Sequence, residues 1–292
     1  MEKTSSKIYY IISLVIFGTI GVFVKFIPLS SGEIALYRAV LASLMLLIFL
    51  IATKQKIIFK NIKSQLPLLF ISGAFIGFNW IFLFEAYNYT TVSVATISYY
   101  FAPVLVTLVS PIIFKEKMTA KNIICFIFST IGLVLITGIG DLSSGKSHLI
   151  GVAFGLGAAL LYASIIIINK LIKNVQGVTR TFIQFVSAIV VLLPYVALTS
   201  GFNISTLNAN GLIVLLIVGL VHTGVTYCMF FSSLKDLKGQ QVAILSYIDP
   251  LVAVLLSVVA LGEKLTLTQA LGGLLVLGFA LINEIKFKSK KR

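Results

Sequence analysis

The sequence has few charged residues, and acidic ones are the scarcest. Only 11% of its 292 residues are charged, with nine Asp and Glu against 23 Lys and Arg. A soluble domain has about 25% charged and about 45–50% apolar residues. Here 59% of the residues are hydrophobic and the mean hydropathy is +1.07. This composition excludes an ordinary soluble fold and predicts an all-α polytopic membrane protein.

Cysteine is also scarce, and the motifs of common enzymes are missing. Cys125 and Cys228 lie in separate apolar segments without clustered ligands, which favours packing over a disulfide or a metal site. The chain has no His-Glu-x-x-His, Gly-x-Ser-x-Gly or Gly-x-x-x-x-Gly-Lys string. Gly138-Ile139-Gly140-Asp141 matches a string of intramembrane aspartyl proteases, but it precedes a Leu-Ser-Ser-Gly loop, and we interpret it as a coincidence. We therefore expect no enzyme, no cofactor and no metal, and any driving force would be an ion or solute gradient.

Long apolar segments are what the sequence does contain. A helix needs about 20 mainly apolar residues to cross the hydrocarbon core. Ten segments are candidates, although the fifth is short: 8–26, 33–52, 66–87, 92–114, 122–137, 149–169, 180–199, 211–231, 242–261 and 266–285. The first lacks an Ala-x-Ala-like cleavage site and leads into further spans, so we interpret it as a retained helix rather than a signal peptide.

The distribution of basic residues predicts the orientation in the membrane. If the N-terminus is cytoplasmic, 19 of the 23 Lys and Arg lie on the cytoplasmic side, and the outside holds only Lys25, Arg38, Lys146 and Lys264. This asymmetry follows the positive-inside rule and predicts that both termini are cytoplasmic. The net charge of +14 is then a topology signal, not a sign of a nucleic-acid partner, and we expect the basic tail to lie against anionic lipid headgroups. The excess of Lys over Arg and the abundant Ile favour a bacterial cytoplasmic (inner) membrane.

The two halves of the chain resemble each other. Shifting the sequence by 147 residues aligns a set of identical pairs: Gly77/Gly224, Phe84/Phe231, Ile97/Ile244, Tyr100/Tyr247, Pro103/Pro250, Ser110/Ser257, Glu116/Glu263, Lys117/Lys264 and Thr119/Thr266. The repeats would span 1–147 and 148–292, with five helices each. Because five is odd, the second repeat would enter the membrane from the opposite side, an arrangement typical of secondary transporters.

These features resemble the EamA-type members of the drug/metabolite transporter superfamily. The resemblance rests on five plus five helices, on Pro103 and Pro250, and on the Glu-Lys pair that follows each proline before a Gly-rich helix. It implies a permease, in character an exporter, for small metabolites such as amino acids, with a cavity between the halves. The sequence departs from the common pattern at Asn79-Trp80, His222 and Asp249.

Polar and aromatic residues near the middle of the predicted spans are the candidate site. We predict that the substrate is bound by Asn79, Trp80, Tyr99, Tyr100, Tyr162, His222, Tyr227, Tyr247 and Asp249. Aromatic side chains offer apolar faces, hydroxyl groups and cation–π surfaces to a small organic solute that carries an amine. The alternative for each aromatic residue is helix packing.

Three ionisable residues are candidates for ion or proton coupling, because charged groups within spans are costly. Asp249 would hold an ammonium group or a proton, or would cap a helix that restarts before Pro250. His222 would carry a proton, or would be a neutral residue between helices. Glu85 would guard the external mouth, or would extend to water. By contrast, Glu33 and Arg38 are interpreted as an interfacial pair.

Pro103 and Pro250 are candidate gating positions. Each removes an intrahelical hydrogen bond, and the alternative is a static kink that shapes the cavity. Two other function classes remain open at this point. One is an exporter of lipophilic cations or drugs, and the other is a membrane sensor or scaffold.

Overall fold

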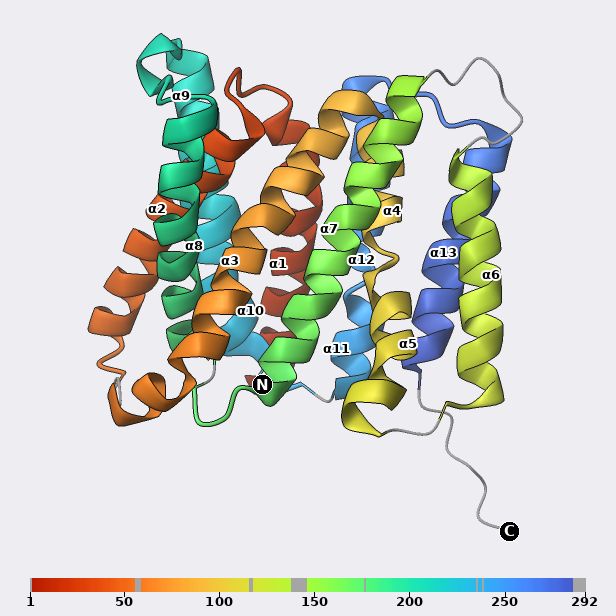
Figure 1. Cartoon of the computed structure of the whole chain (residues 1–292), viewed down its shortest axis with the longest axis horizontal. Coiled ribbons are helices and arrows are strands. Elements are labelled where there is room, and N and C mark those ends of the chain that lie inside the picture. Colours follow the sequence, from red (N-terminus) through yellow and green to blue (C-terminus); the bar gives the residue numbers. More distant parts are fainter. Residues whose placement is uncertain are drawn as a thin grey trace.

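The computed structural model of the protein describes residues 2–55, 59–115, 118–137, 146–175, 177–234, 236–237 and 239–285. Within these ranges all regular structure is helical, and no strand occurs (Figure 1). The Glu116-Lys117 pair, the string 138–141 and the basic tail after residue 285 lie outside the described residues. The prediction of an all-α protein is confirmed.

The helices follow the apolar segments of the sequence closely. They are α1 (Glu2–Val24), α2 (Ser31–Ala52), α3 (Phe59–Tyr89), α4 (Val92–Tyr99), α5 (Ala102–Phe114), α6 (Ala120–Thr137), α7 (Lys146–Leu171), α8 (Gly177–Thr199), the 3-10 turn η1 (Ile204–Thr206), α9 (Ala209–Leu216), the π-helix η2 (Ile217–Val225), α10 (Thr226–Leu234), α11 (Gly239–Leu245), α12 (Ile248–Leu261) and α13 (Leu267–Glu284). In the described residues, seven helical stretches are long and apolar enough to cross a membrane, and 120–136, 248–261 and 267–283 are shorter apolar helices. The protein is a multi-pass membrane protein.

Local sequence sets the first residues of several helices. Ser30 caps α2, because its hydroxyl accepts from the Glu33 amide while the Glu33 carboxylate accepts from the Ser30 amide. Thr266 and Gln269 form the same capping box at the start of α13. These boxes satisfy amides that have no partner within the helix.

Two predicted spans are interrupted, and the interruptions lie 146 residues apart, one residue less than the spacing of the sequence identities. Tyr100 and Phe101 separate α4 from α5, whereas Ser246 and Tyr247 separate α11 from α12. A proline follows each break within the first turn of the next helix, where a missing amide costs least because first-turn amides lack a helical partner. Both breaks therefore lie just before the prolines that were predicted to mark them.

A further irregularity, which the sequence analysis did not predict, is the π-helical segment η2 within the stretch 209–234. Hydroxyl groups of this stretch bond to carbonyl oxygens five residues earlier, Thr223 to Val218 at 2.8 Å and Thr226 to Val221 at 2.7 Å. These bonds match the wider turn of a π-helix, a conformation that is frequent at functional sites.

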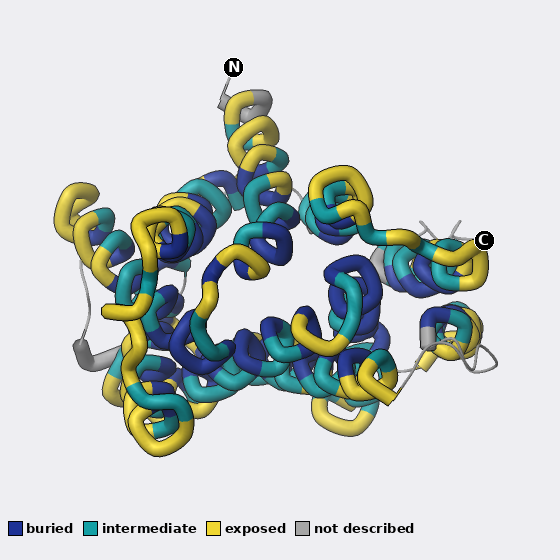
Figure 2. Tube along the Cα trace, turned by 90° about the horizontal axis from the view of Figure 1, so that it is seen from above, coloured by how far each residue is buried: buried dark blue, intermediate teal, exposed yellow. Residues whose placement is uncertain are grey.

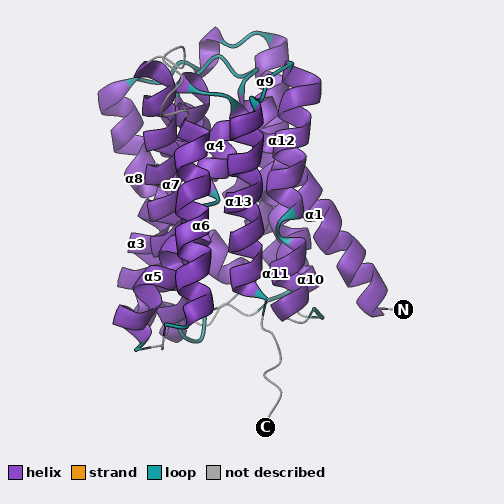
Figure 3. Ribbon diagram, turned by 90° about the vertical axis from the view of Figure 1, so that its right-hand side faces the viewer, coloured by secondary structure: helices purple, strands orange, loops and turns teal. Residues whose placement is uncertain are grey.

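The helices run side by side between two loop-bearing ends (Figures 1 and 3). Seen from one end, buried residues face the interior and exposed residues face outward (Figure 2). Many exposed residues are large and apolar, such as Leu198 at 86% and Ile112 at 81% exposure. In a membrane these side chains face lipid.

The pair α6 and α13 packs at one edge of the molecule (Figure 1). Gly132 and Gly272 face each other where the two helices come close together. A Cβ atom built on Gly132 would lie 2.7 Å from the Gly272 carbonyl oxygen, and one on Gly272 would lie 2.6 Å from that of Gly132. Small residues permit such contact between membrane helices. With this pair at the edge, the remaining helices surround the interior of the protein.

Candidate functional site

A cavity of about 620 Å³ lies among helices from both halves of the chain. Residues of α1, α2, α3, α4, α5, α7, α8, α10, α11 and α12 line it, together with residues of the two helix breaks. Its volume is in the range of about 300–1,000 Å³ that is usual for sites of small organic ligands. The lining mixes apolar and aromatic side chains with a few polar ones.

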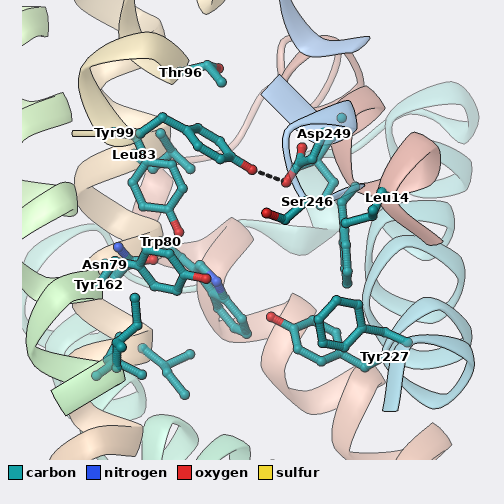
Figure 4. A pocket seen from close by; sticks show the side chains of 18 of the residues that line it. Leu14, Asn79, Trp80, Leu83, Thr96, Tyr99, Tyr162, Tyr227, Ser246 and Asp249 are labelled. Atoms are coloured by element: carbon teal, nitrogen blue, oxygen red, sulfur yellow. Dashed lines mark hydrogen bonds between the residues drawn. The ribbon is translucent and has the colours of Figure 1, made fainter. Parts of the chain in front are cut away.

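Eight of the nine predicted substrate-binding residues line this cavity. They are Asn79, Trp80, Tyr99, Tyr100, Tyr162, Tyr227, Tyr247 and Asp249, and Pro103 lies beside them. In Figure 4, Asn79, Trp80 and Tyr162 project from one side, and Ser246 and Asp249 from the other. The structure thus brings together residues that are up to 170 positions apart in the sequence.

The carboxylate of Asp249 faces the other interrupted helix. Asp249 lies in the first turn of α12, and its Oδ2 accepts a hydrogen bond of 2.5 Å from the hydroxyl of Tyr100, at the break after α4. The N-cap position of α12 is occupied by Tyr247, which makes no side-chain capping bond. The interpretation of Asp249 as the N-cap was therefore wrong, because the helix restarts one residue before it. Instead, its carboxylate links the two breaks across the cavity.

The interpretation of Glu33 and Arg38 as an interfacial pair was wrong for Arg38. Its side chain lines the cavity and is only 4% exposed. Its Nε donates to the hydroxyl of Thr223 in η2 at 2.6 Å, and its guanidinium carbon lies 4.2 Å from the centroid of the Trp80 ring. Glu33 is also buried, but it belongs to the capping box of α2. Its carboxylate accepts a hydrogen bond of 2.5 Å from the backbone amide of Asn203.

A simple signal for Arg38 was present in the sequence. The residue lies seven positions after Ser31, which corresponds to a depth of about 10 Å at 1.5 Å per helical residue. A charged side chain at that depth is not interfacial. The true start of the helix, fixed by the capping box, makes this depth clear.

A polar cluster at another part of the wall was not predicted. The amide nitrogen of Gln184 in α8 donates to Asn169 Oδ1 at 2.7 Å and to Ser72 Oγ at 2.6 Å. Arg180, in the first turn of α8, lies 3.5 Å from the Asn169 carbonyl oxygen. Gln184 and Asn169 hold α8, α7 and α3 together and leave polar groups at the cavity surface. An isolated Gln within an apolar segment was the available signal.

His222 lies outside the cavity wall. It is 3% exposed, its Nε2 lies 2.6 Å from the Thr19 hydroxyl of α1, and its Nδ1 lies 3.2 Å from the Ile217 carbonyl oxygen. The Phe23 ring packs against it at 4.7 Å between centroids. This environment matches the alternative of a histidine hydrogen-bonded between helices and gives no support to direct substrate contact.

Glu85 also lies outside the cavity wall. Its carboxylate accepts a hydrogen bond of 2.6 Å from Ser31, at the start of α2, and lies 3.4 Å from the amide nitrogen of Asn88. The residue therefore links the ends of α2 and α3. A role at the external mouth stays a prediction.

Contacts between the two halves of the chain lie at the end of the molecule where α4 begins. The Glu263 carboxylate accepts bonds from the amides of Val92 at 2.8 Å and of Ser93 at 3.2 Å. The hydroxyls of Ser93 and Ser257 also bond to each other. The cavity lining extends the other way, to Asn169 in the last turn of α7 and Arg180 in the first turn of α8.

Apolar helices around a cavity with few polar groups define a multi-pass membrane protein with an internal site for a small solute. The sequence profile of the EamA-like transporter family matches residues 4–138 and again 149–284. The chain belongs to this family. The resemblance noted in the sequence is confirmed, and it places the protein among transporters rather than enzymes.

Similar proteins agree with this assignment. The chain is 33% identical over 291 residues to the uncharacterized transporter YxxF of Bacillus subtilis, covering 99% of this chain and 92% of that protein. An uncharacterized transporter of Archaeoglobus fulgidus is 32% identical over 195 residues, 66% of this chain and 67% of its own. One solved crystal structure superposes with a TM-score of 0.65, covering 95% of this chain and 96% of its own, at 14% identity, which indicates likeness of fold alone.

Proposed function

We propose that the protein is a secondary-active transporter that exports small organic metabolites, such as amino acids, by alternating access. The cavity carries this proposal, because its walls come from both halves of the chain and because Tyr100 and Asp249 join the two helix breaks across it. Broken helices around a central site are where secondary transporters bind their solutes. Family membership supports the same function.

The architecture that fits this function is ten membrane crossings in two inverted repeats, 1–147 and 148–292. The family profile matches the chain twice, and the helix breaks recur at a spacing of 146 residues, within one residue of the spacing of the sequence identities. The basic residues favour cytoplasmic termini in a bacterial inner membrane. With that orientation, the Glu263 contacts close the external side, and the lining at Asn169 and Arg180 lies toward the cytoplasm.

Alternating access requires that the Glu263 contacts break when the external side opens. The breaks before Pro103 and Pro250 are the positions at which α5 and α12 would reorient, because no continuous helical hydrogen bonding has to be disrupted there. Asp249 is the first candidate to hold a substrate ammonium group or a coupling proton. His222 and Glu85 remain second candidates for coupling.

Flux through the purified protein tests this function. Proteoliposomes that contain the wild type or Asp249→Asn would be loaded with labelled L-leucine, L-threonine or L-lysine, and exchange would be measured with and without a proton gradient. We expect exchange of at least one amino acid by the wild type and loss of most of it in Asp249→Asn. Asp236→Asn is the matched control, because Asp236 lies outside the cavity and bonds to the exposed Ser6.

The alternatives predict different results in the same vesicles. Exchange of tetraphenylphosphonium without exchange of any amino acid would make the protein an exporter of lipophilic cations, which the aromatic lining and Asp249 favour as second candidate. Amino-acid binding without flux would indicate a sensor. Equal flux in the wild type and Asp249→Asn would contradict the role of Asp249.

A further inference from the structure

Arg38 is a buried cation without an anionic partner among the described residues. Its described contacts are the Thr223 hydroxyl and the faces of the Trp80 and Phe84 rings, whose centroids lie 4.2 and 5.7 Å from the guanidinium carbon. An unpaired charge within a membrane protein is costly, so such residues usually face a partner, a ligand or an aqueous cavity. Arg38 lines the cavity, which makes a bound anion its natural partner.

The position of the guanidinium group leaves one edge for a ligand. The Nε edge is fixed by Thr223, and one face lies against Trp80. The two terminal nitrogens form no hydrogen bond with any described residue. A planar guanidinium fork matches a carboxylate with two parallel hydrogen bonds, and a side chain held on two sides loses little freedom when it makes them.

The negative charge of the cavity, on Asp249, is not paired with Arg38. Asp249 bonds to Tyr100, and the described side chains of Arg38 and Asp249 form no ion pair with each other. Of the described residues that line the cavity, Asp249 alone is acidic, so no other carboxylate repels an anion at Arg38. Two unlike charges, each bonded to a neutral hydroxyl group, offer complementary sites to a solute that carries both charges.

We propose that Arg38 is the carboxylate receptor of the cavity and that the protein selects small zwitterions or carboxylates with an apolar chain over the corresponding amines. The apolar chain would contact the aliphatic and aromatic lining, which includes Leu83, Ile165 and Tyr227. This inference rests on the proposed function, because it assigns the substrate class of the same cavity. It selects amino acids over lipophilic cations among the candidate substrates.

Trp80 is the only tryptophan of the chain and lies against Arg38, so its fluorescence reports binding at this position. Purified protein in detergent would be titrated with L-leucine, 4-methylpentanoate and 3-methylbutylamine, which share a carbon skeleton and differ in the carboxylate and the amine. We expect leucine and 4-methylpentanoate to change the emission of the wild type at lower concentrations than the amine does. Arg38→Gln should weaken binding of both carboxylates roughly 10- to 100-fold and leave the amine unaffected.

Two variants control for folding and for total charge. Arg38→Lys keeps the charge and loses the fork, so its affinity for the carboxylates should lie between those of the wild type and Arg38→Gln. Lys146→Gln removes a positive charge from an exposed position at the start of α7 and should bind all three compounds as the wild type does. If Arg38→Gln does not fold, the comparison of leucine with 3-methylbutylamine on the wild type still decides the question.

Three results would overturn the inference: equal affinity of the wild type for leucine and 3-methylbutylamine, no response to either carboxylate, or unchanged leucine binding by a folded Arg38→Gln. Vesicle flux separates this outcome from failure of the proposed function. Flux of 3-methylbutylamine without flux of the carboxylates would refute the receptor role and leave transport standing. Binding that depends on Arg38 but is not accompanied by flux would support the receptor role and refute transport.

Discussion

Tyr100 and Asp249 belong to different halves of the chain, and their hydrogen bond of 2.5 Å is a direct polar link across the cavity. Each lies beside a helix break, where the backbone changes direction without a continuous ladder of hydrogen bonds. Under the proposed mechanism, the link would couple the cavity to the two positions at which α5 and α12 reorient. Substitution of Tyr100 tests this coupling without removing a charge.

For Tyr100→Phe we expect weaker binding of leucine by about 10-fold, because a hydrogen bond to a charged group contributes about 1.5–3 kcal/mol and part of it is replaced by water. The Kd would be measured by titration of Trp80 fluorescence. Tyr195→Phe is the control, since Tyr195 packs against Phe78 outside the cavity. Equal loss in both variants would show that the hydroxyl of Tyr100 has no specific role.

For His222→Ala we expect a loss of stability rather than of transport. The imidazole bonds to Thr19 and packs against Phe23, so its removal leaves a buried hydroxyl and a space between α1 and η2. In a double-mutant cycle with Thr19→Val, thermal unfolding should give a coupling energy of about 0.5–1.5 kcal/mol. If His222→Gln is as stable as the wild type but loses proton-driven flux, the proton-carrier hypothesis is restored.

For single residues, the sequence showed which polar side chains lie deep in the membrane, but it did not show what those side chains contact. The five predicted tyrosines, Asn79, Trp80 and Asp249 stand out in apolar segments, and all of them line the cavity. Arg38 was missed because its depth depends on where α2 begins, and His222 was overvalued because the direction of a side chain depends on helix rotation. Neither quantity follows from composition alone.

Among the helices, the prolines predicted where two spans break, since proline without its amide fits the first turn of a restarting helix. The π-helical segment η2 was not predictable in the same way. Its nine residues contain no proline, and the register shift depends on side-chain bonds to carbonyl oxygens five residues earlier. The shift matters for the site because it places Thr223 against Arg38.

The pair α6 and α13 offers a test of helix packing away from the cavity. Gly132→Ala and Gly272→Ala should each destabilise the protein by about 1–3 kcal/mol, because the added methyl group overlaps the facing backbone. Gly278→Ala is the matched control in α13, where no atom lies within 4 Å of the added Cβ, and it should be neutral or stabilising by up to about 1 kcal/mol. Thermal unfolding in detergent measures the three variants. Equal melting temperatures would contradict the close packing.

For the whole molecule, the few charges that are present carry more information than the many apolar residues. Nineteen of the 23 basic residues lie on one side under the proposed topology, and this asymmetry predicts the orientation. Of the charged residues inside the molecule, Arg38 and Asp249 line the cavity, whereas Glu33 lies at the start of α2 and Glu263 contacts the start of α4. Under the proposed function, the same few charges serve both the orientation in the membrane and the recognition of a solute.

The inverted arrangement of the halves predicts that two equivalent positions lie on opposite sides of the membrane. Met118 follows α5, and Leu265, 147 residues later, follows α12. In an inverted repeat these residues lie on opposite sides of the membrane, whereas in a parallel repeat they lie on the same side. Cysteine placed at each would be probed with a membrane-impermeant maleimide in intact cells. We expect Leu265→Cys to react at once and Met118→Cys to react only after permeabilisation.

Two further positions fix the absolute orientation. Gln55, exposed between α2 and α3, should be protected in intact cells as Gln55→Cys, and Ser205, exposed in η1, should react as Ser205→Cys. The native Cys125 and Cys228 are buried, so the unmodified chain supplies the unlabelled background. Reaction of Met118→Cys and Leu265→Cys from the same side would contradict the inverted repeat.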